Sequence, residues 1–170
     1  MALQVVVFWG VFLFVLPPFI AGFDRLVADT PSSPRRAAAA LLFVVASSLG
    51  IASAITMVLQ GRGTPLPIDG PRHLVVRGPY AWVRNPMAVA GLAQGTAVAL
   101  WLGSPLVLAY VIAGGVLWHW FVRPLEESHL LATFGAEYGA YRARVPLWLP
   151  RRAIARSSDG APAGDSRGRP

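Results

Sequence analysis

Two adjacent carboxylates and a few arginines are the side chains of this sequence that are best suited to chemistry. Glu126 and Glu127 follow a long uncharged run, and Arg123 precedes them. Arg84 stands near the end of an earlier polar segment. A guanidinium and a carboxylate form strong, directional hydrogen bonds with each other and with charged groups of a ligand. Arg84 and Arg123 are therefore candidate partners of Glu127 in a functional site.

A helix is expected to carry both carboxylates. It should begin near Pro124 and end at Gly135, because proline suits a first helical turn and glycine a C-terminal stop. Helical spacing puts Glu127 on the apolar, buried face and Glu126 nearer its edge. The apolar residues of that face are Leu130, Leu131 and Phe134. Both acids would stabilise the helix N-terminus by ~0.3–1 kcal/mol each, but this simpler role does not explain a carboxylate on a buried face, where an unpaired charge is costly.

The polar segment 71–86 is the second candidate. Its prolines exclude one continuous helix, and its aromatic and aliphatic residues argue against disorder. Gly78-Pro79 predicts a turn, from which Tyr80 and Arg84 project. Alternatively, these side chains only anchor the protein at a membrane surface, with the aromatic ring at the interface and the arginine on lipid phosphates. The residues alone leave both interpretations open.

The histidines do not predict a metal site. His119 lies between two tryptophans in an apolar run and is expected to be a hydrogen-bonded core or interfacial residue. The spacing of the three histidines matches no metal-ligand motif, and no phosphate-binding glycine motif or serine-nucleophile motif occurs. Cysteine is absent, which excludes disulfides and thiolate ligands.

Membrane-spanning helices are the elements predicted to position these residues. Hydrophobic residues make up 55% of the 170 residues and charged residues 14%, against roughly 25% charged in soluble domains. The stretches 1–23, 37–61 and 85–122 carry no charge. A span needs about 20 apolar residues, so the last stretch holds two short spans joined by a turn at Gly103-Ser104-Pro105. We predict an all-α integral membrane protein with about four transmembrane helices, at 2–22, 37–60, 87–103 and 105–122.

These spans are predicted to form one domain, 1–156. The segment 157–170 is rich in small and polar residues without an apolar face, and it is expected to be a disordered tail. A cleaved signal peptide is the alternative for the first stretch. That stretch has no positively charged start, however, and no small-residue cleavage site precedes Asp24.

The placement of arginine predicts the orientation in the cell membrane. All 15 basic residues are arginine, and most flank the apolar runs, which argues against a nucleic-acid partner. The arginine-rich segments 62–84 and 123–156 lie on the same side if the chain has four spans. Arginine excess marks the cytoplasmic side, so both candidate segments are predicted to be cytoplasmic. Tyr138 and Tyr141 at helical spacing, followed by Trp148, predict an interfacial C-terminal helix with an aromatic anchor.

Together these segments resemble the isoprenylcysteine carboxyl methyltransferase and phospholipid methyltransferase superfamily of membrane enzymes. The matching text runs through His73-Leu74, Gly78-Pro79-Tyr80 and Val83-Arg84-Asn85-Pro86-Met87, and then through Glu126-Glu127, Leu130, Phe134-Gly135, Tyr138, Tyr141 and Val145-Pro146. The resemblance covers roughly the second half of the chain. The sequence departs from it at Asn85, where many members have histidine, and at Ala88, where tyrosine is frequent.

The resemblance implies a methyltransferase that uses S-adenosylmethionine and acts on a lipid-like or hydrophobic acceptor entering from the bilayer. No obligate protein partner is evident. The implied cofactor site lies between the loop and the glutamate-bearing helix, with His73, Leu74, Gly78, Pro79, Tyr80, Arg84, Asn85, Glu126 and Glu127 as its residues. Arg84, Arg123 and Glu127 are the implied catalytic residues.

The chemistry of these residues fits methyl transfer. The methyl donor is a sulfonium cation, to which Glu127 and Tyr80 offer a negative charge and an aromatic face. Arg84 or Arg123 could orient a carboxylate acceptor without any base, whereas an amine acceptor would need Glu127 to take its proton. Two alternatives remain. One is a sterol-type membrane reductase using NADPH, for which the loop lacks a phosphate cradle, and the other is a non-catalytic membrane scaffold.

Overall fold

The computed structural model describes residues 10–24, 30–61 and 72–149, and every regular element in these ranges is a helix. The elements are η1 Val11–Val15, α2 Leu16–Phe23, α3 Ser33–Thr56, η2 Met57–Gly61, η3 Gly78–Ala81, α4 Pro86–Leu102, α5 Pro105–Leu117, η4 Trp118–Val122 and α6 Arg123–Arg144. The predicted all-α class is confirmed. The predicted tail and the start of the first predicted span lie outside the described residues.

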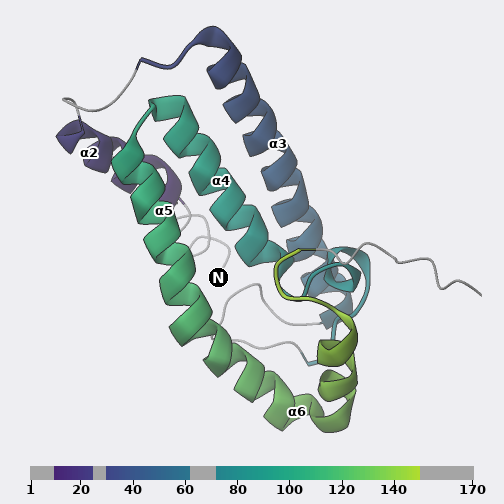
Figure 1. The fold of residues 1–170 in the computed structure, drawn as a ribbon. Coiled ribbons are helices and arrows are strands. Elements are labelled where there is room, and N and C mark those ends of the chain that lie inside the picture. Colours follow the sequence, from purple (N-terminus) through teal and green to yellow (C-terminus); the bar gives the residue numbers. More distant parts are fainter. Residues whose placement is uncertain (1–9, 25–29, 62–71, 150–170) are drawn as a thin grey trace, which may run out of the picture.

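Helices α2, α3, α4 and α5 form one bundle (Figure 1). α3 packs along α4, and α5 packs against α4 and α2. α5 continues without a break through η4 into α6. This helical rod therefore extends beyond the N-terminal end of α4. The loop before α4 and the residues after α6 lie at this same end of the bundle.

Small side chains let α4 approach its neighbours closely. Ala90, Ala97 and Ala99 are buried. A Cβ at Gly95 would lie only 2.7 Å from Cγ2 of Val111 in α5, so glycine is required for this distance between the two helices. Small residues at helix contacts are typical of helices that pack within a membrane, where close van der Waals contact drives association.

The turn between α4 and α5 follows directly from its sequence. α4 ends at Gly103, whose φ of 68° is in the left-handed region that favours glycine. Ser104 caps α5 by accepting a hydrogen bond from Val107 N–H at 3.1 Å. The buried carboxylate of Asp24 accepts hydrogen bonds from the Ser104 hydroxyl and from Leu106 N–H. These hydrogen bonds hold the end of α2 against the turn between α4 and α5, at the end of the bundle away from α6.

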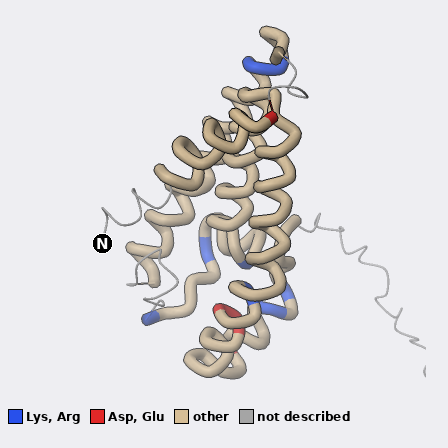
Figure 2. Tube along the Cα trace, turned by 90° about the vertical axis from the view of Figure 1, so that its left-hand side faces the viewer, with Lys and Arg blue, Asp and Glu red and all other residues tan. Residues whose placement is uncertain are grey.

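Charged residues gather towards the two ends of the described bundle and leave an uncharged band between them (Figure 2). Ser33–Gly61 and Pro105–Arg144 are long and apolar enough to cross a membrane, and Val11–Phe23 and Pro86–Leu102 are shorter apolar helices. The apolar part of Pro105–Arg144 ends at residue 122, because charged residues follow from there. Two of the four predicted spans therefore meet the length and hydropathy criteria, and the total of four stays a prediction.

Gly135 reverses the direction of α6. Its φ of 51° and ψ of −125° are not helical, as its predicted role as a helix stop requires, and residues 136–144 fold back towards the loop. Leu131 is 46% exposed, so the prediction that it shares the buried face with Glu127 is wrong. The reason is that the first half of α6 extends beyond the bundle, and only its side facing the loop is covered.

Replacing Gly135 by alanine is expected to lower the melting temperature of the detergent-purified protein. The left-handed backbone costs a residue with a Cβ ~1–3 kcal/mol, although no neighbouring atom blocks the Cβ itself. Gly139→Ala is the matched control, because Gly139 also lies in α6 with room for a Cβ but has no positive φ. Alanine there should keep or raise the melting temperature. Equal melting temperatures of the two variants would contradict this account of the reversal.

Candidate functional site

The loop before α4 places Arg84 and Asn85 at the end of the bundle where α6 lies. η3 begins at Gly78, whose φ is 59° and whose Cβ, if it had one, would lie 3.1 Å from the hydroxyl of Thr56 in α3. Asn85 caps α4, because its side-chain oxygen accepts a hydrogen bond from Ala88 N–H at 3.0 Å. The close approach at Gly78 and the cap at Asn85 fix both ends of the segment that carries Arg84.

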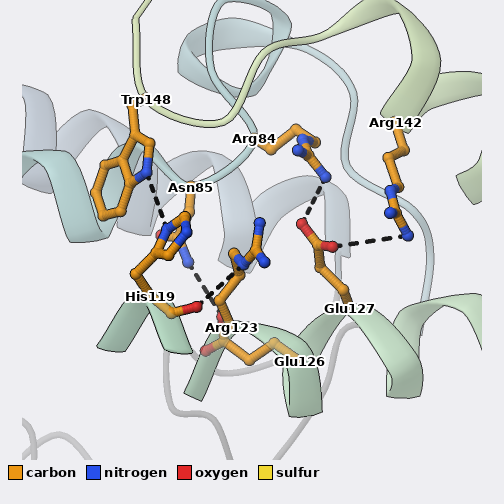
Figure 3. A network of polar contacts seen from close by, with 8 residues as sticks. All are labelled: Arg84, Asn85, His119, Arg123, Glu126, Glu127, Arg142 and Trp148. Atoms are coloured by element: carbon orange, nitrogen blue, oxygen red, sulfur yellow. Dashed lines mark hydrogen bonds and ion pairs between the residues drawn. The ribbon is translucent and has the colours of Figure 1, made fainter. Parts of the chain in front are cut away.

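Arg84 and Asn85 each pair with one of the two carboxylates of α6 (Figure 3). Nη1 of Arg84 donates to Oε1 of Glu127 at 2.5 Å, and Nδ2 of Asn85 donates to Oε2 of Glu126 at 3.2 Å. Nη1 of Arg142 lies 3.7 Å from the second oxygen of Glu127. Glu127 is thus held by an arginine on each oxygen, whereas Glu126 is held by a neutral amide. We call Arg84, Asn85, Glu126 and Glu127 the polar network.

The ion pair at the centre of this network is largely shielded from solvent. The side chains of Arg84 and Glu127 are only 14% and 12% exposed. Removing charges from water is costly, and such a pair is retained only when its geometry and its further hydrogen bonds compensate. Arg142 supplies part of that compensation for Glu127.

Residues 136–149, which we call the return segment, form hydrogen bonds with the backbone of the loop. The hydroxyl of Tyr141 donates to the carbonyl oxygen of Tyr80 at 2.8 Å, and both side chains are buried. The carbonyl oxygen of Pro146 accepts a hydrogen bond from Arg84 N–H at 2.9 Å. The return segment therefore fixes the loop backbone both at Arg84 and just before it.

In the view of Figure 3, Arg123 lies between the Asn85–Glu126 pair and the Arg84–Glu127 pair. Its Nε donates to the carbonyl oxygen of His119 at 3.2 Å, and within the described residues its terminal nitrogens have no partner. His119 is held in turn by Trp148, whose Nε1 donates to Nδ1 of the histidine at 3.2 Å. Arg123 thus brings to the polar network a guanidinium whose two terminal nitrogens have no partner in the described part of the chain.

Burial shifts the pKa of two groups at the site, both of which lie outside the apolar runs. The pKa of Glu126 is raised to about 7, chiefly by burial; the hydrogen bond from Asn85 opposes this shift, and the negative charge of Glu127 adds to it. Burial also raises the pKa of the Tyr80 hydroxyl, with smaller contributions from Tyr141 and Glu126. Glu126 therefore changes its charge near neutral pH, while Tyr80 stays protonated and able to donate a hydrogen bond.

The structure brings together part of the predicted site. All three predicted catalytic residues, Arg84, Arg123 and Glu127, lie at the polar network. The predicted cofactor residues divide into three groups. Arg84, Asn85, Glu126 and Glu127 form the network, and Pro79 and Tyr80 are buried in the loop segment beside it. The others, His73, Leu74 and Gly78, lie at the start of the loop, where the backbone N–H of His73 donates to the Gly61 oxygen at the end of η2 and its side chain is exposed.

Sequence analysis missed two residues of the site. Arg142 forms an ion pair with Glu127, and the buried Tyr138 lies close enough to Glu127 and Arg84 for both to act on the pKa of its hydroxyl. Both come from the return segment, and no local spacing connects them with the carboxylates, because the reversal at Gly135 brings them there. The i, i+4 spacing of Tyr138 and Arg142 was the available signal, since it places both on one helix face.

One known protein family matches the part of the chain that contains the polar network. The model of the phospholipid methyltransferase family matches residues 34–137, which is more than half of the chain and includes the loop and both carboxylates. The chain belongs to the phospholipid methyltransferase family. The resemblance seen in the sequence is thereby confirmed.

Several curated relatives match a little less than half of the chain. The protein-S-isoprenylcysteine O-methyltransferase of Schizosaccharomyces pombe is 33% identical over 79 residues, which is 45% of this chain and 33% of the relative. The proteins of the same name from Xenopus laevis and Homo sapiens are each 34% identical over 80 residues, which is 45% of this chain and 27% of the relative. The matched part of the chain thus spans a third or less of these relatives.

The raised pKa of Glu126 predicts that stability depends on pH. A carboxyl whose pKa is higher in the folded protein holds its proton more tightly there than in the unfolded chain. Its contribution to stability is therefore complete below the ordinary pKa of 4.5 and is lost as the pH rises through about 7. The fall in melting temperature between about pH 5 and about pH 8 should be larger for the wild type than for Glu126→Gln.

Thermal unfolding of both proteins in the same detergent measures this difference. All other titrating groups are common to the two proteins and cancel in the comparison. An identical pH dependence would show that Glu126 is not the buried group described here.

Proposed function

We propose that this protein transfers a methyl group from S-adenosylmethionine to the carboxylate of an apolar, lipid-like acceptor at the cytoplasmic face of the cell membrane. The observation that carries the proposal is the buried polar network, in which Arg84 pairs with Glu127 and Asn85 with Glu126, in a chain of the phospholipid methyltransferase family. The similar proteins from Schizosaccharomyces pombe and Homo sapiens are named as O-methyltransferases, which supports transfer to oxygen.

The residues of the network fit the amino-acid end of the cofactor. Nε of Arg84 is buried and has no hydrogen-bond partner within the described residues. A buried donor without an acceptor costs about 1–3 kcal/mol, and a carboxylate oxygen of a ligand would satisfy it. Glu126 is held only by a neutral amide, so its carboxylate can also accept hydrogen bonds from an ammonium group or a hydroxyl. When bound, S-adenosylmethionine supplies an electrophilic methyl group on a positively charged sulfur.

Arg123 favours a carboxylate as the acceptor. Its unpaired terminal nitrogens can hold a carboxylate through two parallel hydrogen bonds. A carboxylate oxygen forms the new bond to the methyl carbon while the bond between that carbon and sulfur breaks, and no proton is transferred. An amine acceptor would need a proton acceptor, and both oxygens of Glu127 are already paired with arginines. Transfer to an amine is therefore the less favoured alternative.

In the proposed methyl transfer, the chain increases the reaction rate by holding the reacting groups in position. Holding the reacting atoms about 3–3.5 Å apart and in line can supply most of the acceleration of such a displacement. Arg84 and Glu127 fix each other, and the return segment fixes the backbone of Arg84, so the groups that would bind the cofactor are already ordered. Preordered binding groups lose less entropy when the ligand binds.

We also propose four membrane spans with the network at the cytoplasmic end. The loop and α6 lie together at one end of the bundle, beyond the apolar lengths of α4 and α5. Arg72 and Arg77 of the loop and Arg142 and Arg144 of the return segment are exposed, and both segments lie at this end. Arginine excess beside apolar helices is typical of the cytoplasmic side.

Titration of the detergent-purified protein with S-adenosylmethionine in a calorimeter is expected to show saturable binding. Glu127→Gln and Arg84→Ala should each weaken it about tenfold or more, because each leaves one member of a buried charge pair without its partner. Glu137→Gln is the matched control, since it makes the same change on an exposed side chain of α6 and should bind like the wild type.

Circular dichroism establishes that each variant is folded before binding is compared. Wild-type protein that is folded and shows no saturable binding at about millimolar cofactor would contradict the proposal and favour a non-catalytic scaffold. Equal affinities of Glu127→Gln and Glu137→Gln would move the cofactor site away from the network.

A further inference from the structure

A groove with a volume of about 340 Å³ runs between α4 and the helical rod formed by α5 and η4. Leu92 and Thr96 of α4 line one side, and Ile112, Gly115 and Val116 of α5 line the other. The groove opens to the outer surface of the bundle, where Ile112 and Val116 are more than half exposed. The hydroxyl of Thr96 is already bonded to the carbonyl oxygen of Leu92, so these walls present hydrocarbon.

One end of the groove is polar and adjoins the network. His119, Trp120 and Trp148 line the groove there. Because Nδ1 of His119 accepts a hydrogen bond from Trp148, a neutral His119 carries its proton on Nε2 and can donate from it. The carbonyl oxygen of the same histidine holds Nε of Arg123. The groove therefore runs from apolar walls to His119, whose carbonyl oxygen binds Arg123 of the proposed acceptor site.

Gly115 faces Leu92 across the groove. A Cβ at this position would lie 3.2 Å from Cδ2 of Leu92, so any larger side chain would narrow the groove there. The next glycine is oriented differently, because a Cβ at Gly114 would have no atom within 4 Å. Of these two adjacent glycines in one helix, only Gly115 lines the groove.

Helix geometry gives the length of the groove. On the α5–η4 rod its lining extends from Val111 to Trp120, which corresponds to about 13 Å at the helical rise per residue. From Gly115 to Trp120 the distance is about 7 Å by the same rise. A large side chain at position 115 would therefore leave only about half of the groove connected to its polar end.

We propose that this groove holds the single apolar tail of the methyl acceptor, and that Gly115 determines how long a tail fits. The inference rests on the proposed function, because it takes Arg123 as the group that binds the acceptor's head. The volume lies at the lower end of the range of about 300–1,000 Å³ for small-molecule sites. It suits one hydrocarbon chain rather than the two chains of a diacyl lipid.

Photo-crosslinking of the full-length protein in lipid nanodiscs tests the inference without requiring turnover. The probe is an N-acetyl-S-alkylcysteine with a carboxylate head and a diazirine at the end of a tail about 13 Å long. In the wild type and in Gly114→Leu, mass spectrometry should find the label on the peptides that line the groove. In Gly115→Leu, this labelling should fall about tenfold or more, because the mutant side chain fills the space of several methylene groups.

Val116→Trp is a second variant, which fills the groove from its exposed rim without touching the contact with Leu92. It should also lose the label. Equal labelling of the groove in the wild type and both filled variants would overturn the inference. So would a label spread evenly over all lipid-facing helices, or equal labelling by a two-tailed phosphatidylethanolamine probe.

Calorimetry on the same samples separates this inference from the proposed function. Gly115→Leu should bind S-adenosylmethionine like the wild type, because position 115 lies outside the polar network. Normal cofactor binding with unchanged groove labelling would overturn only the role of the groove. Groove labelling without any cofactor binding would overturn the proposed methyl transfer and leave the groove as a tail-binding site.

Discussion

The arrangement of the site depends on the need to pair the carboxylate of Glu127 where it is shielded from water. One chain segment alone does not meet this need. Arg84 reaches Glu127 from the loop and Arg142 reaches it from the return segment, so two other parts of the chain converge on this side chain. Leaving such a charge unpaired would cost several kcal/mol, and the convergence is correspondingly well defined. The same pairing leaves Arg84 Nε and the end of Arg123 without partners in the described chain, which creates the capacity to bind a ligand.

Two local features, a helix cap and a reversal of the helix direction, make this convergence possible. Asn85 caps α4 and at the same time binds Glu126, so the start of a helix and the arrangement of the site depend on one side chain. Gly135 turns α6 back on itself, and Tyr141 and Pro146 of the return segment then bind the loop backbone. Through Trp148 the return segment also contacts His119 at the end of the groove. The proposed cofactor and tail sites therefore share one structural support.

Much of this arrangement could be predicted from the sequence. Apolar runs interrupted by Gly103-Ser104-Pro105 predicted the α4–α5 hairpin, and the need to pair a carboxylate on a buried helix face predicted Arg84 as a candidate partner of Glu127. Other features depend on the tertiary fold. The reversal at Gly135, read from the sequence as a simple stop, brings Arg142 to Glu127. Leu131 is exposed because the first half of α6 extends beyond the bundle. Hydrophobic periodicity did not reveal these outcomes, because it reports one helix at a time and not which neighbour covers it.

The central claim is that the polar network binds S-adenosylmethionine. Ultraviolet crosslinking of the folded protein with methyl-labelled S-adenosylmethionine, followed by mapping of the labelled peptides, tests this claim most directly. The account predicts label on peptides from the loop, 72–85, and from α6, and loss of that label when unlabelled S-adenosylhomocysteine is present in excess. Displaceable label confined to the opposite end of the bundle, around Asp24 and Ser104, would contradict it, and so would label that the competitor does not displace.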